Sequence, residues 1–369
     1  MTTKTRIIPA LLLAAILLAS SVRADTEGDY TYEVTDGKAT ITAFKQYYLG
    51  ALVIPDTLGG YPVTRIGPDA FNSCQDITHV TICGGITDIG DWAFAACDSL
   101  ARIMIPGSVT NIGYGAFIWC SSLTDIDVES ENLFYKSQGG VLFDKELTSL
   151  VAFPAGKTGD YTIPNDVTSI GAGAFLECTG LTGVFIPDSV SFIGGYAFSG
   201  CADLSSVTIP DSVTYIGGGA FAGCSGLTVF SVDAENPAYS SNDGVLFNKG
   251  QTTLIICPNG KTGHYCIPSG VGSILSQAFK GCDGLTGITI PDSVTYVGWR
   301  AFSSCTKLTS VTIGSGVTTF DREALSGCTS LIAINVVVEN PSYSSDDGVL
   351  LNKGRTALLQ YPLGRTGAY

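Results

Sequence analysis

Hydrophobic positions recur along this chain in short alternating runs that end at proline or glycine. In residues 201–221, CADLSSVTIPDSVTYIGGGAF, Val207 and Ile209 alternate with polar residues, as on a strand with one buried face. Pro210 lacks the N–H that a further ladder hydrogen bond needs, so it ends the strand. Val213 begins a second short apolar edge. One such unit cannot enclose a core, so the pattern predicts coils that stack.

An Ala-Phe pair marks the same place in successive units. Within a trio the phenylalanines are 23 residues apart, and consecutive trios are separated by 58 residues, which gives a larger period of 104. The sequence therefore predicts nine 23-residue units and three longer irregular units, arranged as three tandem blocks. The nine marker positions are Phe71, Phe94, Phe117, Phe175, Phe198, Phe221, Phe279, Phe302 and Leu325.

Seven of the nine units have glycine three residues before the alanine, as at Gly217. We expect a turn with positive φ at this position, which glycine adopts without steric cost. Leu275 and Asp321 replace the glycine in two units, so we expect strain or local remodelling at both.

These motifs resemble a known family. The string I-G-x-x-A-F-x-x-C-x-x-L-T-x-V-x-I-P-x-S-V, carried by residues 193–213, is similar to the BspA-like leucine-rich repeats of secreted and surface proteins. Asn236–Leu246 and Tyr30–Phe44 resemble further elements of that family, the second its N-terminal cap. The resemblance implies a curved leucine-rich-repeat solenoid, mostly β, with short helical turns at the Ala-Phe corners. It also implies a surface adhesin or interaction protein that binds other proteins, host matrix components included, but it transfers no binding residue.

The chain divides into three expected segments. The last copy of the repeat stops at Tyr369, just before the point where its sister blocks continue into another strand, so we expect a missing C-terminal cap and a truncated sequence. The alternative is a natural terminus that a partner chain covers. The segments are a signal peptide at 1–24, an N-terminal β cap at 25–62 and the leucine-rich-repeat solenoid at 63–369.

The first residues have the features of an export signal. Lys4 and Arg6 precede an apolar run, and Val22 and Ala24 fit the small residues of a cleavage site, so the exported chain should begin at Asp25. The apolar run is short for a membrane span, and no later segment is long and apolar enough. We expect a secreted or cell-surface protein.

Nine of the twelve cysteines hold one place in the repeat, three residues after the Ala-Phe pair. A catalytic cysteine is needed once and works with a histidine, whereas the chain has only two histidines. Zinc sites use close pairs such as C-x-x-C, and the chain has none. Nine is an odd number, so these cysteines cannot all pair in disulfides. We expect a buried column of thiols at Cys74, Cys97, Cys120, Cys178, Cys201, Cys224, Cys282, Cys305 and Cys328.

Three cysteines fall outside this column. Cys257 and Cys266 lie nine residues apart in one block, and their counterparts in the sister blocks are not cysteines. In an exported chain these two could form a local disulfide, or they could be two independent small residues of the core. Cys83 would stay unpaired in either case.

Charge and motif content argue against several functions. The formal net charge is −14, and removal of the leader leaves 16 basic against 33 acidic residues, which is −17. An acidic chain without a basic stripe is poorly suited to nucleic acids or anionic membranes. Asp346-Asp347-Gly348 reads as a hairpin turn rather than a calcium loop, and His79 and His264 have no partner evident in the sequence. We therefore expect no enzyme, no metal and no cofactor.

The outward residue between the two inward positions of each strand gives a candidate binding face. Five of the nine outward residues are Thr or Ser, and Met, Asp and Phe interrupt the row. Such an irregular face favours a protein or glycan over a crystal lattice, and a protein adhesin is the preferred interpretation. The alternative is a secreted carbohydrate-binding or matrix-forming protein, which would expose clustered aromatic residues. The candidate positions are Met104, Asp127, Phe185, Thr208, Thr289 and Thr312.

Overall fold

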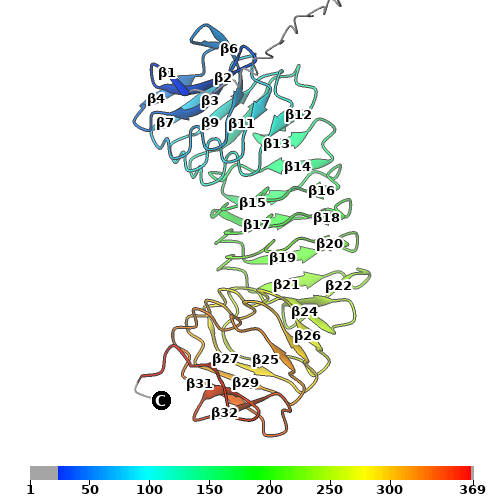
Figure 1. Ribbon diagram of the computed structural model, residues 1–369. Coiled ribbons are helices and arrows are strands. Elements are labelled where there is room, and N and C mark those ends of the chain that lie inside the picture. The colour runs from blue at the N-terminus through cyan, green and yellow to red at the C-terminus, as the bar shows by residue number, and fades with distance from the viewer. Residues whose placement is uncertain (1–23, 367–369) are drawn as a thin grey trace, which may run out of the picture.

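The computed structural model describes residues 24–366, which form a β-solenoid bent into an arc (Figure 1). No helix in this part of the chain is long and apolar enough to cross a membrane. The predicted signal peptide lies outside the described residues except for Ala24, which begins the first strand.

The solenoid alternates larger sheets with four-stranded ones and ends in a three-stranded sheet. The four-stranded sheets are parallel and have the orders β11-β9-β7-β4, β15-β17-β19-β21 and β25-β27-β29-β31. No strand of one four-stranded sheet pairs with a strand of the next, so the sheets break at the block boundaries predicted from the 104-residue period. Their strands are β4 (Gly50–Val53), β7 (Ile77–Thr81), β9 (Arg102–Ile105), β11 (Asp125–Val128), β15 (Gly159–Thr162), β17 (Leu181–Phe185), β19 (Ser206–Ile209), β21 (Val229–Val232), β25 (Gly263–Cys266), β27 (Leu285–Ile290), β29 (Ser310–Ile313) and β31 (Ala333–Val336).

The three larger sheets begin with antiparallel strands and continue as parallel ones, whereas the final three-stranded sheet is antiparallel throughout. Their orders are β1-β2-β3-β6-β8-β10 with β5 on β6, then β12-β13-β14-β16-β18-β20, β22-β23-β24-β26-β28-β30 and a final β32-β33-β34. Their strands are β1 (Ala24–Glu27), β2 (Tyr30–Thr35), β3 (Lys38–Phe44), β5 (Thr57–Leu58), β6 (Tyr61–Ile66), β8 (Asp88–Ile89), β10 (Asn111–Ile112), β12 (Tyr135–Gln138), β13 (Val141–Asp144), β14 (Ser149–Ala152), β16 (Ser169–Ile170), β18 (Phe192–Ile193), β20 (Tyr215–Ile216), β22 (Tyr239–Asn242), β23 (Val245–Asn248), β24 (Thr253–Ile256), β26 (Ser273–Ile274), β28 (Tyr296–Val297), β30 (Thr319–Phe320), β32 (Tyr343–Asp346), β33 (Val349–Asn352) and β34 (Leu358–Gln360).

Each longer unit contains a β-hairpin, which accounts for its extra length. In the third block Asp346 pairs with Val349, and the two residues between them, Asp347 and Gly348, have φ of 46° and 77°. Two successive positive φ values are those of a type I′ turn, whose twist matches that of the flanking strands. The Asp346–Gly348 segment is therefore a hairpin turn, as the sequence predicted.

A stack of aromatic rings runs through the core along the solenoid. Phe175 and Phe198 are parallel with centroids 4.7 Å apart, and Phe198 and Phe221 follow at 5.1 Å. Phe153 of the longer unit, which follows Ala152, continues the stack 4.9 Å from Phe175. Three clusters of buried residues, about one for each block, make up the core.

The Ala-Phe corners are not helical, which corrects the expectation of short helical turns; the described residues contain none. Successive N–H groups alternate between two kinds of partner. Phe198 donates to the carbonyl of Ala220 in the next coil at 2.7 Å, whereas Ser199 donates back to Tyr196 at 3.1 Å. Tyr196 and Gly200 have positive φ, which breaks any helical run. Every second donor thus ties neighbouring coils together.

The glycine three residues before the alanine has a different role from the one predicted. Gly217 does not have positive φ, and neither do Leu275 and Asp321, so the expected backbone strain at those two positions is wrong. The glycine is required by close stacking instead. A Cβ at Gly194, for example, would lie 2.5 Å from the backbone nitrogen of Ala172 in the preceding coil.

Candidate functional site

The predicted binding face lies on the four-stranded sheets, where the strand register aligns its residues in three rows. Thr81, Met104 and Asp127 are cross-strand neighbours on β7, β9 and β11. Thr208 pairs with Ser231 on the middle sheet, and Thr289 pairs with Thr312 on the last. The structure therefore brings Met104 and Asp127 together, and Thr289 and Thr312 together, but places the three rows on separate sheets.

Phe185 is the most prominent residue of the middle row. It pairs with Thr162 on β15, and its side chain is 62% exposed at the end of β17. A shallow depression of about 310 Å³ lies beside it and is also lined by Asp160 and Thr208. Gly183, which carries no side chain, leaves this depression open between Phe185 and the neighbouring strands.

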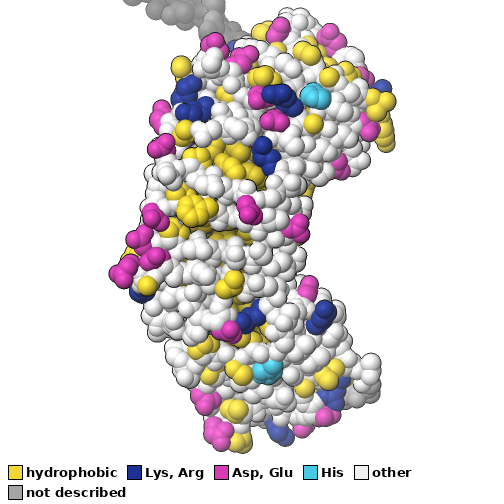
Figure 2. All heavy atoms as spheres, turned by 180° about the vertical axis from the view of Figure 1, so that it is seen from behind, with side chains coloured by type: hydrophobic (Ala, Val, Ile, Leu, Met, Phe, Trp, Pro, Cys, Tyr) yellow, Lys and Arg dark blue, Asp and Glu magenta, His cyan; other side chains and the backbone are white. Residues whose placement is uncertain are grey.

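The rows differ in charge. In the first block Arg102 forms an ion pair with Asp127 and lies opposite His79 on the neighbouring strand. In the third block His264 Nε2 lies 2.9 Å from Thr289 Oγ1. Seen from behind, acidic and basic side chains are dispersed and hydrophobic ones gather over the upper and middle parts of that side (Figure 2). The three rows thus present different chemistry on one scaffold.

All nine cysteines of the predicted column are buried, which confirms their assignment to the core. Their thiols also have a use that the sequence did not reveal. Cys201 donates to the carbonyl of Phe175 at 3.1 Å, and Cys224 donates to that of Phe198 at 3.0 Å, so each thiol links two coils. Burial raises the pKa of Cys74 and of Cys224 to about 12, which keeps both as unreactive thiols near neutral pH.

Cys257 and Cys266 are both free in the structure. Cys257 is 2% exposed and belongs to the core of the last block, whereas Cys266 is exposed on β25. Register places Cys266 beside Thr289, so it extends the third row of the predicted face. Cys83 is also free, and its Sγ donates to the carbonyl of Pro55 at 3.3 Å.

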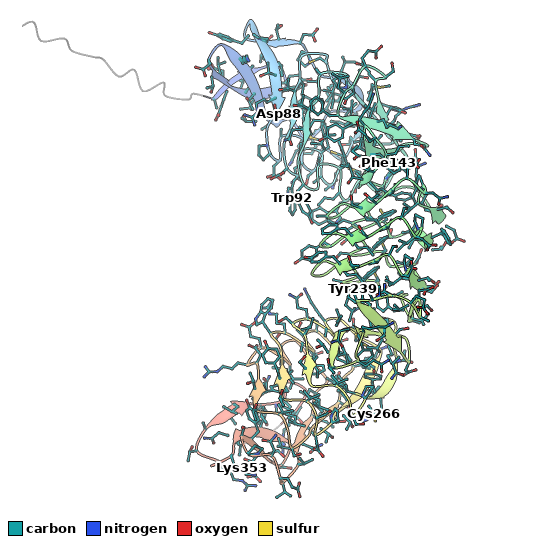
Figure 3. The ribbon with its side chains drawn as sticks, turned by 90° about the vertical axis from the view of Figure 1, so that its right-hand side faces the viewer. Asp88, Trp92, Phe143, Tyr239, Cys266 and Lys353 are labelled. Carbon is teal, nitrogen blue, oxygen red and sulfur yellow. The ribbon has the colours of Figure 1, made fainter. Side chains whose placement is uncertain are left out.

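A cluster of exposed aromatic residues, which sequence reasoning did not single out, lies on the corners of the first block. Trp92, Tyr114 and Trp119, here called the corner cluster, are 36%, 38% and 40% exposed. The Trp92 ring centroid is 5.7 Å from that of Trp119 and 6.4 Å from that of Tyr114. Figure 3 shows Trp92 on the concave side of the arc.

The backbone of the corner cluster is that of the other corners, since Tyr196 and Ala96, at positions equivalent to Trp92 and Trp119, have φ of 55° and 56°. Trp92 and Trp119 have φ of 60° and 58°, a conformation in which bulky residues are rare. A signal for the cluster was present in the sequence, because all three tryptophans of the chain flank an Ala-Phe corner. Trp299, the third, is 41% exposed and packs against the Arg300 guanidinium at 4.7 Å.

Beside the corner cluster lies a hollow of about 180 Å³, where the longer unit lacks a full corner. One coil earlier, Trp92 and Phe94 donate backbone hydrogen bonds to carbonyls of the next coil at 3.1 and 2.9 Å. The corresponding N–H groups of Gly115, Phe117 and Trp119 donate none to any residue among 24–366. Gly115 and Phe117 line the hollow, so it has a row of backbone donors along one wall.

The described residues contain no group of three or more metal-ligating side chains that could hold an ion. His79 Nδ1 lies 3.1 Å from Thr78 Oγ1, and His264 contacts Thr289 as described above. In both contacts the partner of the imidazole is a threonine hydroxyl, so these two histidines are polar members of the exposed surface.

Comparison with known proteins adds the following. The model of the BspA-type leucine-rich repeat region matches residues 40–152, 149–262 and 259–345. The structure is similar to a leucine-rich cell surface protein from Faecalibacterium prausnitzii, with 31% identity over 86% of this chain and 90% of that one, and a TM-score of 0.53. A leucine-rich repeat protein from Eubacterium ventriosum is 25% identical over 84% and 89% of the two chains, with a TM-score of 0.47. A search of curated proteins finds no match.

Proposed function

Because this chain belongs to the BspA-type leucine-rich repeat family, we propose that it is an exported cell-surface scaffold that binds a protein partner through the exposed rows of its four-stranded sheets. Proteins of this family and fold are typically non-catalytic scaffolds. The similar protein from Faecalibacterium prausnitzii is described as a cell surface protein, which supports the proposed location.

One observation carries this proposal: Phe185 is 62% exposed beside a depression on a sheet whose backbone is held by parallel pairing. An exposed aromatic side chain on a rigid element makes a good anchor, because little conformational freedom is lost when a partner covers it. The polar side chains of Asp160 and Thr208 at the edge of the depression would supply hydrogen bonds around that anchor.

The test is binding of the purified chain to immobilised extracellular matrix proteins, measured by surface plasmon resonance. We expect Phe185→Ser to weaken binding by roughly tenfold or more, the effect of losing an aromatic anchor. Phe134→Ser is the matched control, since Phe134 is 50% exposed but lies away from the rows. Equal loss in both variants, or no binding of the wild type, would refute the proposal.

The alternative, a carbohydrate-binding protein, predicted exposed clustered aromatic residues, and the corner cluster has that property. That cluster lies at the Ala-Phe corners and not on the predicted rows, so it is a separate surface with its own candidate ligand.

A further inference from the structure

We propose that the corner cluster, together with the hollow beside it, is a binding site for a neutral carbohydrate chain. This inference goes beyond the protein-binding function proposed above and does not depend on it, because the two surfaces share no residue.

The second block shows that two of the three rings of the corner cluster, Tyr114 and Trp119, are not needed for the fold, whereas Trp92 has an aromatic counterpart in Tyr196. At the 104-residue period, Tyr114 corresponds to Gly218 and Trp119 to Gly223. The first and second blocks nevertheless form equivalent four-stranded sheets, whose last two strands pair in the same register. A structural role would require an aromatic residue in each block, so the two rings serve something other than stacking of the coils.

The backbone does not account for the tryptophan either. Trp119 holds φ of 58° at a position where Gly223 has 74°, a conformation that glycine adopts without steric cost. The positive φ belongs to the corner and not to the ring, because Ala96 and Glu177 hold the equivalent position in other units with φ of 56° and 59°. A bulky ring is therefore present at a position where the backbone itself favours glycine.

The chemistry of the site matches a sugar. The rings of Trp92 and Trp119 meet at 65°, so one ring can stack on the apolar C–H face of a pyranose while the other borders its edge. The free N–H groups of Gly115 and Phe117 in the hollow would donate to hydroxyl or acetamido oxygens. Aromatic walls with a few fixed polar groups are typical of small-ligand sites.

The charges around the site favour a neutral ligand. The carboxylate of Asp91, which contacts the cluster, already accepts the N–H of Tyr114 at 2.7 Å. None of the ion pairs of the described residues involves a member of the cluster, and the chain carries a net charge of −14. An acidic glycan would be repelled by this surface, whereas hydroxyl groups would not.

The test uses the purified full chain with three neutral probes, chitohexaose, cellohexaose and mannohexaose, and with a heparin hexasaccharide as the acidic probe. Binding is measured by calorimetry and by the change in tryptophan fluorescence. We expect at least one neutral probe to bind, and Trp119→Gly and Tyr114→Gly to weaken that binding by roughly tenfold or more each. Both variants copy the second block, so their circular dichroism and melting temperature should stay close to wild type.

Trp299→Ala is the matched control, because Trp299 has similar exposure at a corner without an aromatic neighbour of the cluster, and it should leave binding unchanged. If Trp119→Gly fails to fold, Trp119→Asn replaces it, since asparagine tolerates positive φ. The proposal is overturned if no neutral probe binds, if only heparin binds, or if the Gly variants bind as tightly as wild type. Loss of matrix-protein binding in Trp119→Gly would also overturn it, by making the cluster a protein site. If Phe185→Ser fails to affect protein binding, the proposed protein-binding function is refuted, and the carbohydrate proposal is judged by its own probes and variants alone.

Discussion

Alkaline pH should unfold this protein through its column of buried thiols. A cysteine in the unfolded chain ionises with a pKa of about 8.5, whereas burial holds the pKa of Cys74 and Cys224 in the folded chain at about 12. Above pH 8.5 the unfolded chain therefore binds fewer protons than the folded one, and stability falls as pH rises until the folded pKa is reached. Below pH 8.5 the contribution of each thiol is constant.

The magnitude follows from the same values. Each buried thiol costs about 1.4 kcal/mol of stability per pH unit above 8.5, which is about 2 kcal/mol at pH 10. Burial raises the pKa of seven thiols of the column, which together give roughly 14 kcal/mol, comparable to the roughly 5–15 kcal/mol of a typical domain. These seven are Cys74, Cys97, Cys178, Cys201, Cys224, Cys282 and Cys305. We expect unfolding near pH 10 under reducing conditions, seen as loss of the far-ultraviolet circular dichroism of the sheets.

A single substitution should reverse its effect between neutral and alkaline pH. At pH 7, Cys224→Ala should destabilise by about 1–2 kcal/mol, because it removes buried volume and the thiol bond to Phe198. At pH 10 the same substitution should be neutral or slightly stabilising. The wild-type thiol ionises in the unfolded chain at this pH, which stabilises the unfolded chain by about 2 kcal/mol, and alanine removes that contribution. Urea denaturation at both pH values measures this, with the exposed Cys266→Ala as control. The same change in stability at pH 7 and pH 10 would refute the reasoning.

Three further substitutions or treatments have defined outcomes. Asn236→Ala should destabilise by about 3–5 kcal/mol in urea denaturation, because its buried amide holds two carbonyls and two N–H groups; a cost below 1 kcal/mol would contradict this. Native thiol labelling followed by mass spectrometry should modify Cys266 within minutes and Cys257 only after unfolding, whereas protection of both would point to a disulfide. Asp243→Val should lower stability by about 1–2 kcal/mol at its φ of 49°, while Asp243→Asn should leave the hairpin intact, and equal melting temperatures of the two would contradict the turn assignment.

The periodic sequence predicted the core well, because each stacked coil needs a side chain of the same size and polarity at the same place. The phenylalanine and cysteine columns each occupy one place in the cross-section of the solenoid. The sequence therefore shows each column as a residue type that recurs at the same place in the repeat. The hairpin at Asp347-Gly348 was predicted for a related reason, since two residues with positive φ leave few sequences to choose from.

Two features could not be derived from this pattern. The expected helical turns at the corners are absent because alternate N–H groups bond to the next coil, as at Phe198, and this depends on a neighbour that is 22 residues away. The regular spacing of glycine predicted a turn, but Gly194 allows close contact with Ala172 instead. A single unit gives no information on how closely the next coil approaches.

The candidate binding surfaces lie where the blocks differ, which follows from how a solenoid is built. A residue inside the coil is fixed by its equivalents above and below, so duplicated blocks keep it; a residue on the corner or the outward row has no such neighbour and can change without cost to the core. Tyr114 and Gly218 occupy equivalent corners, and each lines a hollow beside its corner. The first corner places an aromatic ring at its hollow, whereas the second has no side chain there. Positions whose residue changes from one block to the next are therefore the positions where binding specificity can arise. The corner cluster is such a case, because Tyr114 and Trp119 are replaced by Gly218 and Gly223 in the second block.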